Sequence, residues 1–423
     1  MKLIYLKFQY KLIILLAVVF IAISGVSASG QVKVDSIFNR AIEQTKNQKL
    51  DSAIYEANKA LTADKKRGDI CVYLANLYSW KSDYVTAKSF LKQAQANNYV
   101  NDDYYLCLTN VLIRSASYEE FLADLGSFKK NYSDKNDLFK KELTAYEGLQ
   151  RYDDAVELIR NPENKTFVSN SGVDNLYTDI LLKRNKKMIS AYYSLDFFDK
   201  VFTPQHLASL GYSFPVYDNS LGFRVNYANR FGLEDYQLET DFYLKLKKSQ
   251  YLYLNYGYAF NATLFPQHRA GIEYYFPGAP KVEASIGGRF LKYSSTDVYI
   301  VTGHIGRYLG NSFLSLRPYF VLKNPYAEPS ISLNANYRIF GKNELNYWGI
   351  ELGYGNSPDD SYSASQSGQF SQLSNYRVRL EKNFMVGRTS DIHFVFGYSK
   401  EEYLPSLFRN RFTIDLGYKI RLR

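Results

Sequence analysis

The sequence predicts an α + β multidomain protein, in which an N-terminal α-solenoid precedes an antiparallel transmembrane β-barrel of about 14 strands, with 12 strands as the alternative. Three observations support this prediction. An apolar pattern recurs every 34 residues in the first half of the chain, and side chains alternate between apolar and polar from residue 188 onward. The last segment, Phe412 to Leu422, alternates most regularly. Because successive strand side chains point to opposite faces, such contrast suits a wall between lipid and water.

The N-terminus has the three parts of a secretory signal peptide. Three lysines precede an uncharged apolar run over residues 12–23, and the small residues that follow suit cleavage after Ala28. The run is shorter than the roughly 20 apolar residues of a membrane-spanning helix, so a retained anchor is the alternative. We therefore expect residues 1–28 to be removed and the mature protein to be exported.

Composition narrows the class of protein further. The net charge of +10 is modest for 423 residues and does not indicate a nucleic-acid partner. A mean hydropathy of −0.32 and the lack of a long apolar run after residue 23 exclude a bundle of membrane helices. The two cysteines, Cys71 and Cys107, lie among apolar neighbours in helical segments. We expect two buried thiols, with a single disulfide as the alternative.

Residues 31–187 are predicted to form tetratricopeptide-like repeats, because 34 residues is the period of that unit. In such a repeat a small residue lets two helices approach, and an aromatic residue closes the turn between them. The residues expected to pack the repeats in this way are Ala53, Tyr84, Ala87, Tyr118, Tyr152 and Ala155. Stacked repeats present a surface to other proteins, so we expect them to bind a periplasmic protein. A simple spacer is the alternative.

Residues 188–423 are predicted to form the barrel. Turns marked by Gly, Pro or Asn fall at every second junction between strands, and longer segments such as 356–372 fall at the others. Bacterial outer-membrane barrels have short turns on the periplasmic side, and an even strand number leaves both chain ends on that side. The repeats would then be periplasmic. About one residue in five after residue 188 is Tyr, Phe or Trp, which suits the aromatic girdles of a membrane wall. A soluble β-sandwich or propeller is the alternative.

The final strand carries a further pattern. Residues 415–422 read Asp-Leu-Gly-Tyr-Lys-Ile-Arg-Leu, which resembles the signal that the outer-membrane assembly machinery reads on a last strand. This resemblance implies two partners for the barrel: that machinery during assembly, and the lipid of the outer membrane afterwards.

As a whole, residues 35–423 resemble the YaiO-type outer-membrane barrel family, in which helical repeats precede a β-barrel. Local likenesses lie at residues 76–84 in the repeats and at residues 265–273 and 287–290 in the barrel. The resemblance implies a location in the bacterial outer membrane with the N-terminal domain in the periplasm. The order of domains is also similar to that of exopolysaccharide export porins.

The sequence offers little for catalysis. None of the four histidines has the spacing of a metal site, and no cofactor is expected. The nearest local pair for nucleophilic chemistry is His206 with Ser209, and a spacing of three places the two on opposite faces of a strand. We therefore predict that the protein is not an enzyme and assign no catalytic, cofactor-binding or metal-binding residue.

The polar face of the predicted strands is rich in charge. The residues expected to line the lumen are Arg224, Arg230, Glu239, Asp241, Arg269, Glu273, Arg289, Arg338, Arg377, Arg379, Glu381, Arg411, Asp415, Lys419 and Arg421. Ions within a membrane span must be paired or hydrated, so this wall is that of a water-filled pore or of a plug of ion pairs.

Three functions are compatible with these patterns. The first is a conduit for an envelope polymer such as a polysaccharide, with the repeats docking a partner and a basic wall that favours anions. The second is a non-conducting scaffold that anchors the repeats in the outer membrane. The third is a hydrolase or acyltransferase embedded in the barrel.

Overall fold

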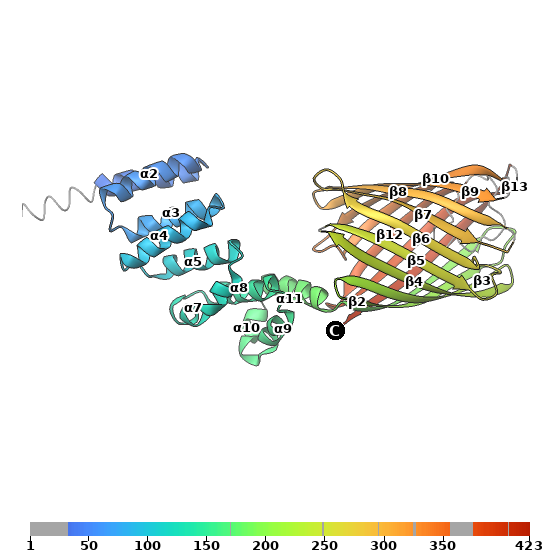
Figure 1. The fold of residues 1–423 in the computed structure, drawn as a ribbon, viewed down its shortest axis with the longest axis horizontal. Helices are drawn as coiled ribbons and strands as arrows, with labels where there is room; N and C mark the ends of the chain where they lie inside the picture. The colour runs from blue at the N-terminus through green and yellow to red at the C-terminus, as the bar shows by residue number, and fades with distance from the viewer. Residues whose placement is uncertain are drawn as a thin grey trace, which may run out of the picture. The chain divides into compact units, whose positions relative to one another are not determined.

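The computed structural model describes residues 33–169, 171–247, 249–294, 296–324, 327–355, 375–404 and 406–423. The expected signal peptide (1–28) and the expected loop at 356–372 lie outside these residues. The chain divides into two compact units, Met1–Ile180 and Leu181–Arg423. The first is helical and the second is a β-barrel (Figure 1).

The first unit is a series of short helices. Residues 33–46 are helical. The helices that follow are α2 (Leu50–Ala63), α3 (Gly68–Trp80), α4 (Tyr84–Ala96), α5 (Asp102–Arg114), α6 (Tyr118–Ala123), α7 (Leu125–Asn131), α8 (Lys135–Gly148), α9 (Tyr152–Arg160), the 3-10 turn η1 (Pro162–Asn164), α10 (Lys165–Val168) and α11 (Ser171–Arg184). Helix α3 packs against α2, α4 and α5, as expected for helices that stack in order along a solenoid.

The 34-residue period sets where helices begin. Leu50, Tyr84, Tyr118 and Tyr152 are the first residues of α2, α4, α6 and α9. Two residues before each of them the backbone is left-handed, with φ of 59°, 63°, 54° and 58° at Gln48, Ser82, Ala116 and Gln150 respectively. Each of these residues follows a helix or its final turn and redirects the chain into the next one. Non-glycine residues rarely adopt this conformation. Because it occurs at all four positions, the same tight turn precedes each of these four helices.

The core of the repeats is made by the small and aromatic residues that share this period. Ala53, Ala87, Phe121 and Ala155 are fully buried. Tyr84 packs, partly buried, against the core between α3 and α4.

Tyr118 packs against the next core, around Phe121 and Phe128, while Tyr152 is half-buried at the start of α9. A Cβ atom at Gly148 would lie 2.1 Å from the Tyr118 ring, so helix α8 approaches α6 at a distance that only glycine allows.

Cys71 and Cys107 are free thiols, and both are fully buried. Burial raises the pKa of the Cys71 thiol to about 11 and that of Cys107 to about 12. Both cysteines therefore act as small apolar residues of the helical core.

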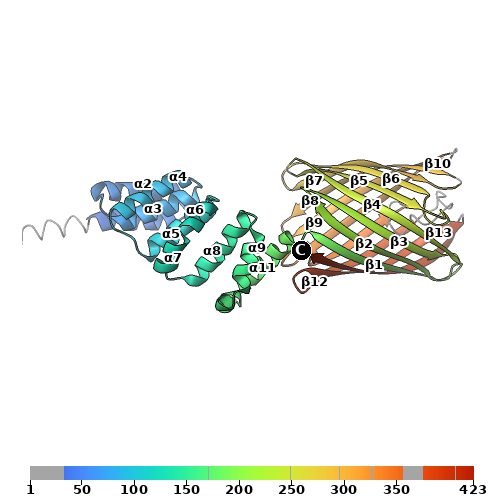
Figure 2. The same ribbon diagram turned by 60° about the horizontal axis from the view of Figure 1, so that its bottom comes forward.

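The second unit contains fourteen strands. They are β1 (Lys187–Phe198), β2 (Gln205–Val216), β3 (Asn219–Arg230), β4 (Leu233–Lys247), β5 (Gln250–Ala259), β6 (His268–Pro277), β7 (Val282–Lys292), β8 (Asp297–Leu309), β9 (Ser312–Asn324), β10 (Ala327–Phe340), β11 (Tyr347–Tyr354), β12 (Asn375–Val386), β13 (Ser390–Leu404) and β14 (Leu407–Leu422). The predicted count of fourteen is confirmed. Figure 2 shows their common tilt.

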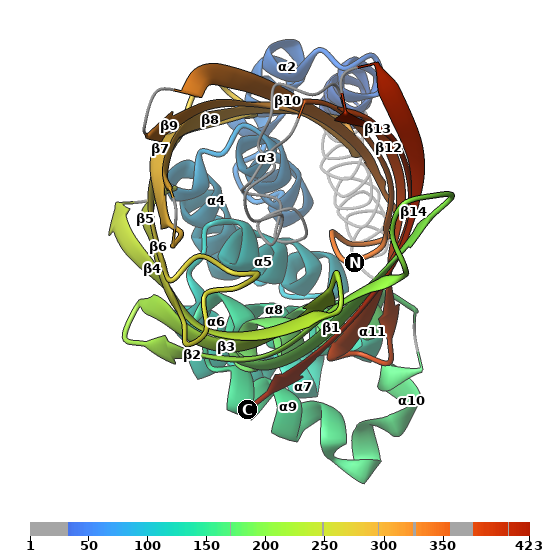
Figure 3. The same cartoon turned by 90° about the vertical axis from the view of Figure 1, so that its right-hand side faces the viewer.

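Each strand pairs antiparallel with its neighbours in sequence, and β1 pairs with β14 to close the ring (Figure 3). The register at the closure runs from Lys187 opposite Leu422 to Phe198 opposite Arg411. Closure leaves no strand edge unpaired, which is what a sheet surrounded by lipid requires. The predicted fold, an α-solenoid followed by an antiparallel barrel, is therefore confirmed.

The outer face of the barrel is apolar. Its side chains stand exposed, among them Ile286 at 60 %, Leu352 at 52 % and Leu416 at 51 %. A soluble sandwich would bury this face, so a lipid environment accounts for it. In the described part of the chain, no helix has the length and apolarity needed to cross a membrane.

The connections at the two ends of the barrel differ less than the sequence indicated. The end where β1 begins and β14 finishes, here called the terminal end, has the expected tight turns, such as Tyr217–Asp218 between β2 and β3. At the opposite end, here called the loop end, β3 and β4 are joined by Phe231 and Gly232 alone. Both of these residues have positive φ, as a two-residue hairpin that follows the strand twist requires. The prediction of longer segments at every loop-end junction was therefore wrong.

Candidate functional site

The inner wall of the barrel carries the charged residues of the strands. Apart from register shifts near the ends of β4, β10 and β13, every second residue of each strand faces inward. All fifteen residues expected in the lumen lie on this inner face. Thirteen of them form four clusters, and Lys419 and Arg421 lie outside these clusters.

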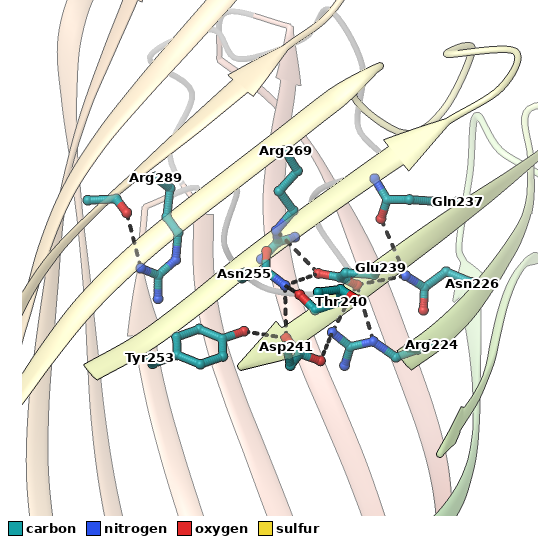
Figure 4. A network of polar contacts seen from close by, with 11 residues as sticks. Arg224, Asn226, Gln237, Glu239, Thr240, Asp241, Tyr253, Asn255, Arg269 and Arg289 are labelled. Atoms are coloured by element: carbon teal, nitrogen blue, oxygen red, sulfur yellow. Dashed lines mark hydrogen bonds and ion pairs between the residues drawn. The ribbon is translucent and has the colours of Figure 1, made fainter. Parts of the chain in front are cut away.

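The first cluster centres on Glu239 of β4, whose side chain is buried (Figure 4). Arg224 of β3 lies 2.8 Å from one of its oxygens, and Arg269 of β6 lies 3.6 Å from the other. Asp241 lies 3.3 Å from the same Arg224 guanidinium. The amide of Asn255 donates hydrogen bonds to both carboxylates, at 2.9 Å to Glu239 and 2.8 Å to Asp241. Two cations and two anions are thus paired across four neighbouring strands.

The second cluster centres on Glu273 of β6, which is 1 % exposed. It accepts hydrogen bonds from Arg289 of β7 at 2.6 Å, from Arg317 of β9 at 2.8 Å and from the Ser285 hydroxyl at 2.5 Å. Arg317 also donates to the Tyr275 hydroxyl at 3.2 Å. One carboxylate therefore joins three strands, with two arginines and a net positive charge.

The third cluster lies on β10 to β14. Arg379 pairs with the fully buried Asp415 two strands away. Arg338 lies 3.4 Å from Glu381, and Arg377 lies 3.4 Å from Glu351. Separately, at the terminal end, Arg421 pairs with Asp391 at 2.6 Å.

The fourth cluster closes the seam at the loop end. Arg411 of β14 pairs with Asp196 of β1 at 2.7 Å and with Glu401 of β13 at 3.1 Å. Arg409 donates to Glu401 from the other side, at 3.0 Å. The buried Arg230 lies 3.8 Å from Asp196.

The ion pairs run along the wall. Each pair named above joins strands no more than three places apart in the ring. With neighbouring strands about 4.8 Å apart and tilted by roughly 40°, a 14-stranded ring has backbone walls about 28 Å apart. Side chains on opposite walls are therefore too distant to pair, and these clusters coat the lumen instead of bridging it.

One loop folds into the lumen. The Asp235 carboxylate of β4 accepts hydrogen bonds from three consecutive backbone N–H groups, those of Thr263, Leu264 and Phe265, at 2.9, 2.9 and 3.0 Å. Leu264 and Phe265 are buried against inward-facing Leu207. The loop between β5 and β6 is thereby fixed against the inner wall, where it narrows the barrel.

Below this loop lies a cavity of about 230 Å³. Its lining residues come from β1 to β4, β6, β13 and β14, and include Ser190, Tyr192, Ser209, Arg224, Asn226, Gln237, Glu239, Phe265, Arg269, His393 and Lys419. Lys419 forms no ion pair with any described residue. The cavity is therefore more basic than the paired clusters around it.

The histidines divide between the two faces. His206 and His268 lie on the outer wall, where their Nδ1 atoms are 2.6 and 2.9 Å from the hydroxyls of Tyr193 and Tyr256. His206 and Ser209 lie on opposite faces of β2. His304 and His393 face inward. Among the described residues, no three or more His, Cys, Asp or Glu side chains cluster as metal ligands do.

Sequence reasoning missed several wall residues. Asp196, Arg317, Glu401 and Arg409 face inward and take part in the clusters, and Asp235 faces inward and holds the β5–β6 loop. Each obeys the same alternation as its strand, so the strand register could have found them.

Comparison with known proteins agrees with this architecture. Residues 186–360 match the family model described as the YaiO membrane beta barrel domain, which confirms the resemblance predicted for the barrel. Among curated proteins, none matches the chain in sequence.

The barrel is similar to several solved structures. A bacterial polysaccharide outer membrane secretin is 7 % identical, with a TM-score of 0.38, and the match covers 56 % of this chain and 99 % of that chain. The outer membrane protein Omp33 of Acinetobacter baumannii is 11 % identical, with a TM-score of 0.37, over 56 % of this chain and 98 % of that chain. The anion-selective porin from Comamonas acidovorans is 8 % identical, with a TM-score of 0.34 and the same coverage of both chains.

Proposed function

We propose that this chain, whose barrel carries a YaiO membrane β-barrel domain, is a conduit of the bacterial outer membrane for an envelope polymer such as a polysaccharide. In this proposal the helical repeats lie in the periplasm and dock a partner protein. We assign no catalytic role to the barrel.

The observation that carries the proposal is the direction of the ion pairs. A plug would need contacts that span the lumen, whereas the pairs of Glu239, Glu273 and Asp415 each join strands on one side of the ring. Charges arranged in this way neutralise one another along the wall and leave the axis to water. Porins with 16 to 18 strands contain an aqueous channel, and a ring of 14 leaves a narrower one.

The repeats offer a surface for the partner. A groove of about 290 Å³ is lined by α4, α5, α6 and α7, with Tyr104, Tyr105 and Leu108 on its apolar side and Lys88 and Lys92 at its edge. A groove that has one apolar side and charged residues at its edge suits a peptide segment of another protein.

The second candidate function is a non-conducting scaffold, and the loop fixed inside the barrel favours it. Leu264 and Phe265 occupy space in the lumen beside the cluster of Glu239. If this loop and the wall side chains together close the passage, the barrel serves only to anchor the repeats.

Single-channel recording of the refolded full chain in planar bilayers separates the two functions. A conduit gives a steady open level, whose anion preference decreases in Arg377→Glu, because this residue faces the lumen. The matched control is Lys342→Glu, an exposed residue in the turn after β10, which leaves selectivity unchanged. Silence from protein that migrates as a folded barrel on an unboiled gel would refute the conduit and support the scaffold.

Docking is tested separately. In cells that express the full chain, chemical crosslinking is expected to recover a periplasmic partner that is lost in Lys92→Glu, at the groove, and kept in Lys59→Glu, a lysine on α2 away from the groove. Equal recovery with both variants would place the partner elsewhere.

A further inference from the structure

We propose that the inner-wall cavity beneath the β5–β6 loop binds a carboxylate-bearing sugar unit, such as a uronic acid. This inference rests on the proposed conduit and names the class of polymer that it carries. Three features of the cavity support it: an unpaired cation, a buried amide donor without a partner, and aromatic rings on the wall.

The cavity attracts anions. Arg224, Arg269 and Lys419 line it, against a single lining carboxylate, Glu239. The two arginines are already engaged with Glu239, at 2.8 and 3.6 Å. Lys419 is exposed, and it has no ion-pair partner among the described residues, so its ammonium group is available to an incoming carboxylate.

The cavity also presents donors that suit hydroxyl groups. Gln237 is 2 % exposed, and its Nε2 atom has no hydrogen-bond partner among the described residues. A buried amide N–H without an acceptor is costly, and a ligand oxygen in the cavity would satisfy it. The hydroxyl groups of Ser190 and Ser209 lie on the same wall and can donate or accept.

Aromatic rings supply the apolar part of the site. Phe265 lines the cavity from the fixed loop and is only 3 % exposed, and Tyr192 lines it from β1. A sugar ring has an apolar face of C–H groups and a rim of hydroxyls. A cavity that combines aromatic faces, amide and hydroxyl donors and one free ammonium group fits a sugar acid better than it fits a simple anion or a neutral sugar.

Isothermal titration calorimetry on the refolded full chain in detergent tests this proposal without requiring conduction. The probes are sodium glucuronate, glucose as the neutral ring and acetate as the anion without a ring. We expect glucuronate to bind at least 10-fold more tightly than either control. Lys419→Gln and Gln237→Leu should each weaken glucuronate binding at least 10-fold, Lys419→Arg should retain it, and Lys342→Gln should leave it unchanged.

Several results would overturn the proposal. These are no binding of glucuronate by the folded wild-type protein, equal binding of glucose or of acetate, or unchanged glucuronate binding in folded Lys419→Gln. Folding of each variant is checked by its migration on an unboiled gel. The proposed conduit fails separately: a barrel that binds glucuronate but carries no current keeps the site and loses the conduit.

Discussion

The replacement Glu273→Gln tests whether the charged clusters on the inner wall stabilise the barrel against unfolding. This carboxylate is 1 % exposed and accepts charged hydrogen bonds from Arg289 at 2.6 Å and from Arg317 at 2.8 Å. Removing one partner of a buried ion pair costs about 3–5 kcal/mol, because the other charge is left without compensation. In this case two arginines lose the same partner.

Two features reduce that cost. The Arg317 side chain is 21 % exposed and keeps its bond to the Tyr275 hydroxyl, so water and that oxygen replace part of what it loses. Arg289 still donates to two backbone carbonyls at 3.2 Å. We therefore expect the free energy of unfolding to fall by about 3 kcal/mol, the lower end of the range.

Equilibrium unfolding in urea, followed by the fraction that migrates as a folded barrel on an unboiled gel, measures this change. The control is Glu283→Gln on the neighbouring strand, whose carboxylate is 43 % exposed and should change stability by no more than about 0.5 kcal/mol. A loss below about 1 kcal/mol in Glu273→Gln would show that the cluster is hydrated like a surface pair, and would refute the reasoning.

Three further predictions concern other parts of the chain. Cys71 and Cys107 should resist iodoacetamide at pH 8 in the folded protein and react in urea, because burial keeps both thiols protonated with pKa values of about 11 and about 12; rapid labelling of the native chain would contradict this. Gly148→Ala should lower the thermal stability of the repeats, by about 1–3 kcal/mol, since its Cβ would lie 2.1 Å from the Tyr118 ring; circular dichroism of the full chain measures it, and an unchanged melting curve would show that the ring moves aside at no cost. Asp235→Ala should release the β5–β6 loop from the wall, because this carboxylate accepts three hydrogen bonds from the loop backbone. We expect a changed single-channel conductance and faster proteolysis within the loop. The same conductance and the same cleavage rate as the wild type would show that the loop is held by its apolar contacts alone.

In the helical half, the repeat period predicted the helices of the repeats but not the backbone conformation of the turns before them. The 34-residue spacing relates Tyr84, Tyr118 and Tyr152, and each of these residues begins a helix. The left-handed turns before these helices were not predicted, because residues such as Ala116 and Gln150 have no preference for positive φ. The repeat imposes that conformation through packing on both sides.

In the barrel, the alternation of each strand predicted which face a charge lies on but not which charge it meets. Glu273 and Arg317 are separated by two intervening strands, and their pairing depends on the accumulated register of β6 to β9. The alternation within one strand contains no information about the register of several strands in succession. The inward fold of the β5–β6 loop was missed for a related reason, since Asp235 recognises backbone N–H groups, which every sequence has.

The closure of the ring between β1 and β14 makes the fourteenth strand the one that completes the wall. A chain that lacks its final strand would expose the hydrogen-bonding edges of β1 and β13 to hydrocarbon, at a cost of several kcal/mol for each unsatisfied backbone group. Premature termination therefore yields a product that is not stable in the bilayer and stays open to proteases. The barrel is therefore stable in the membrane only when all fourteen strands are present.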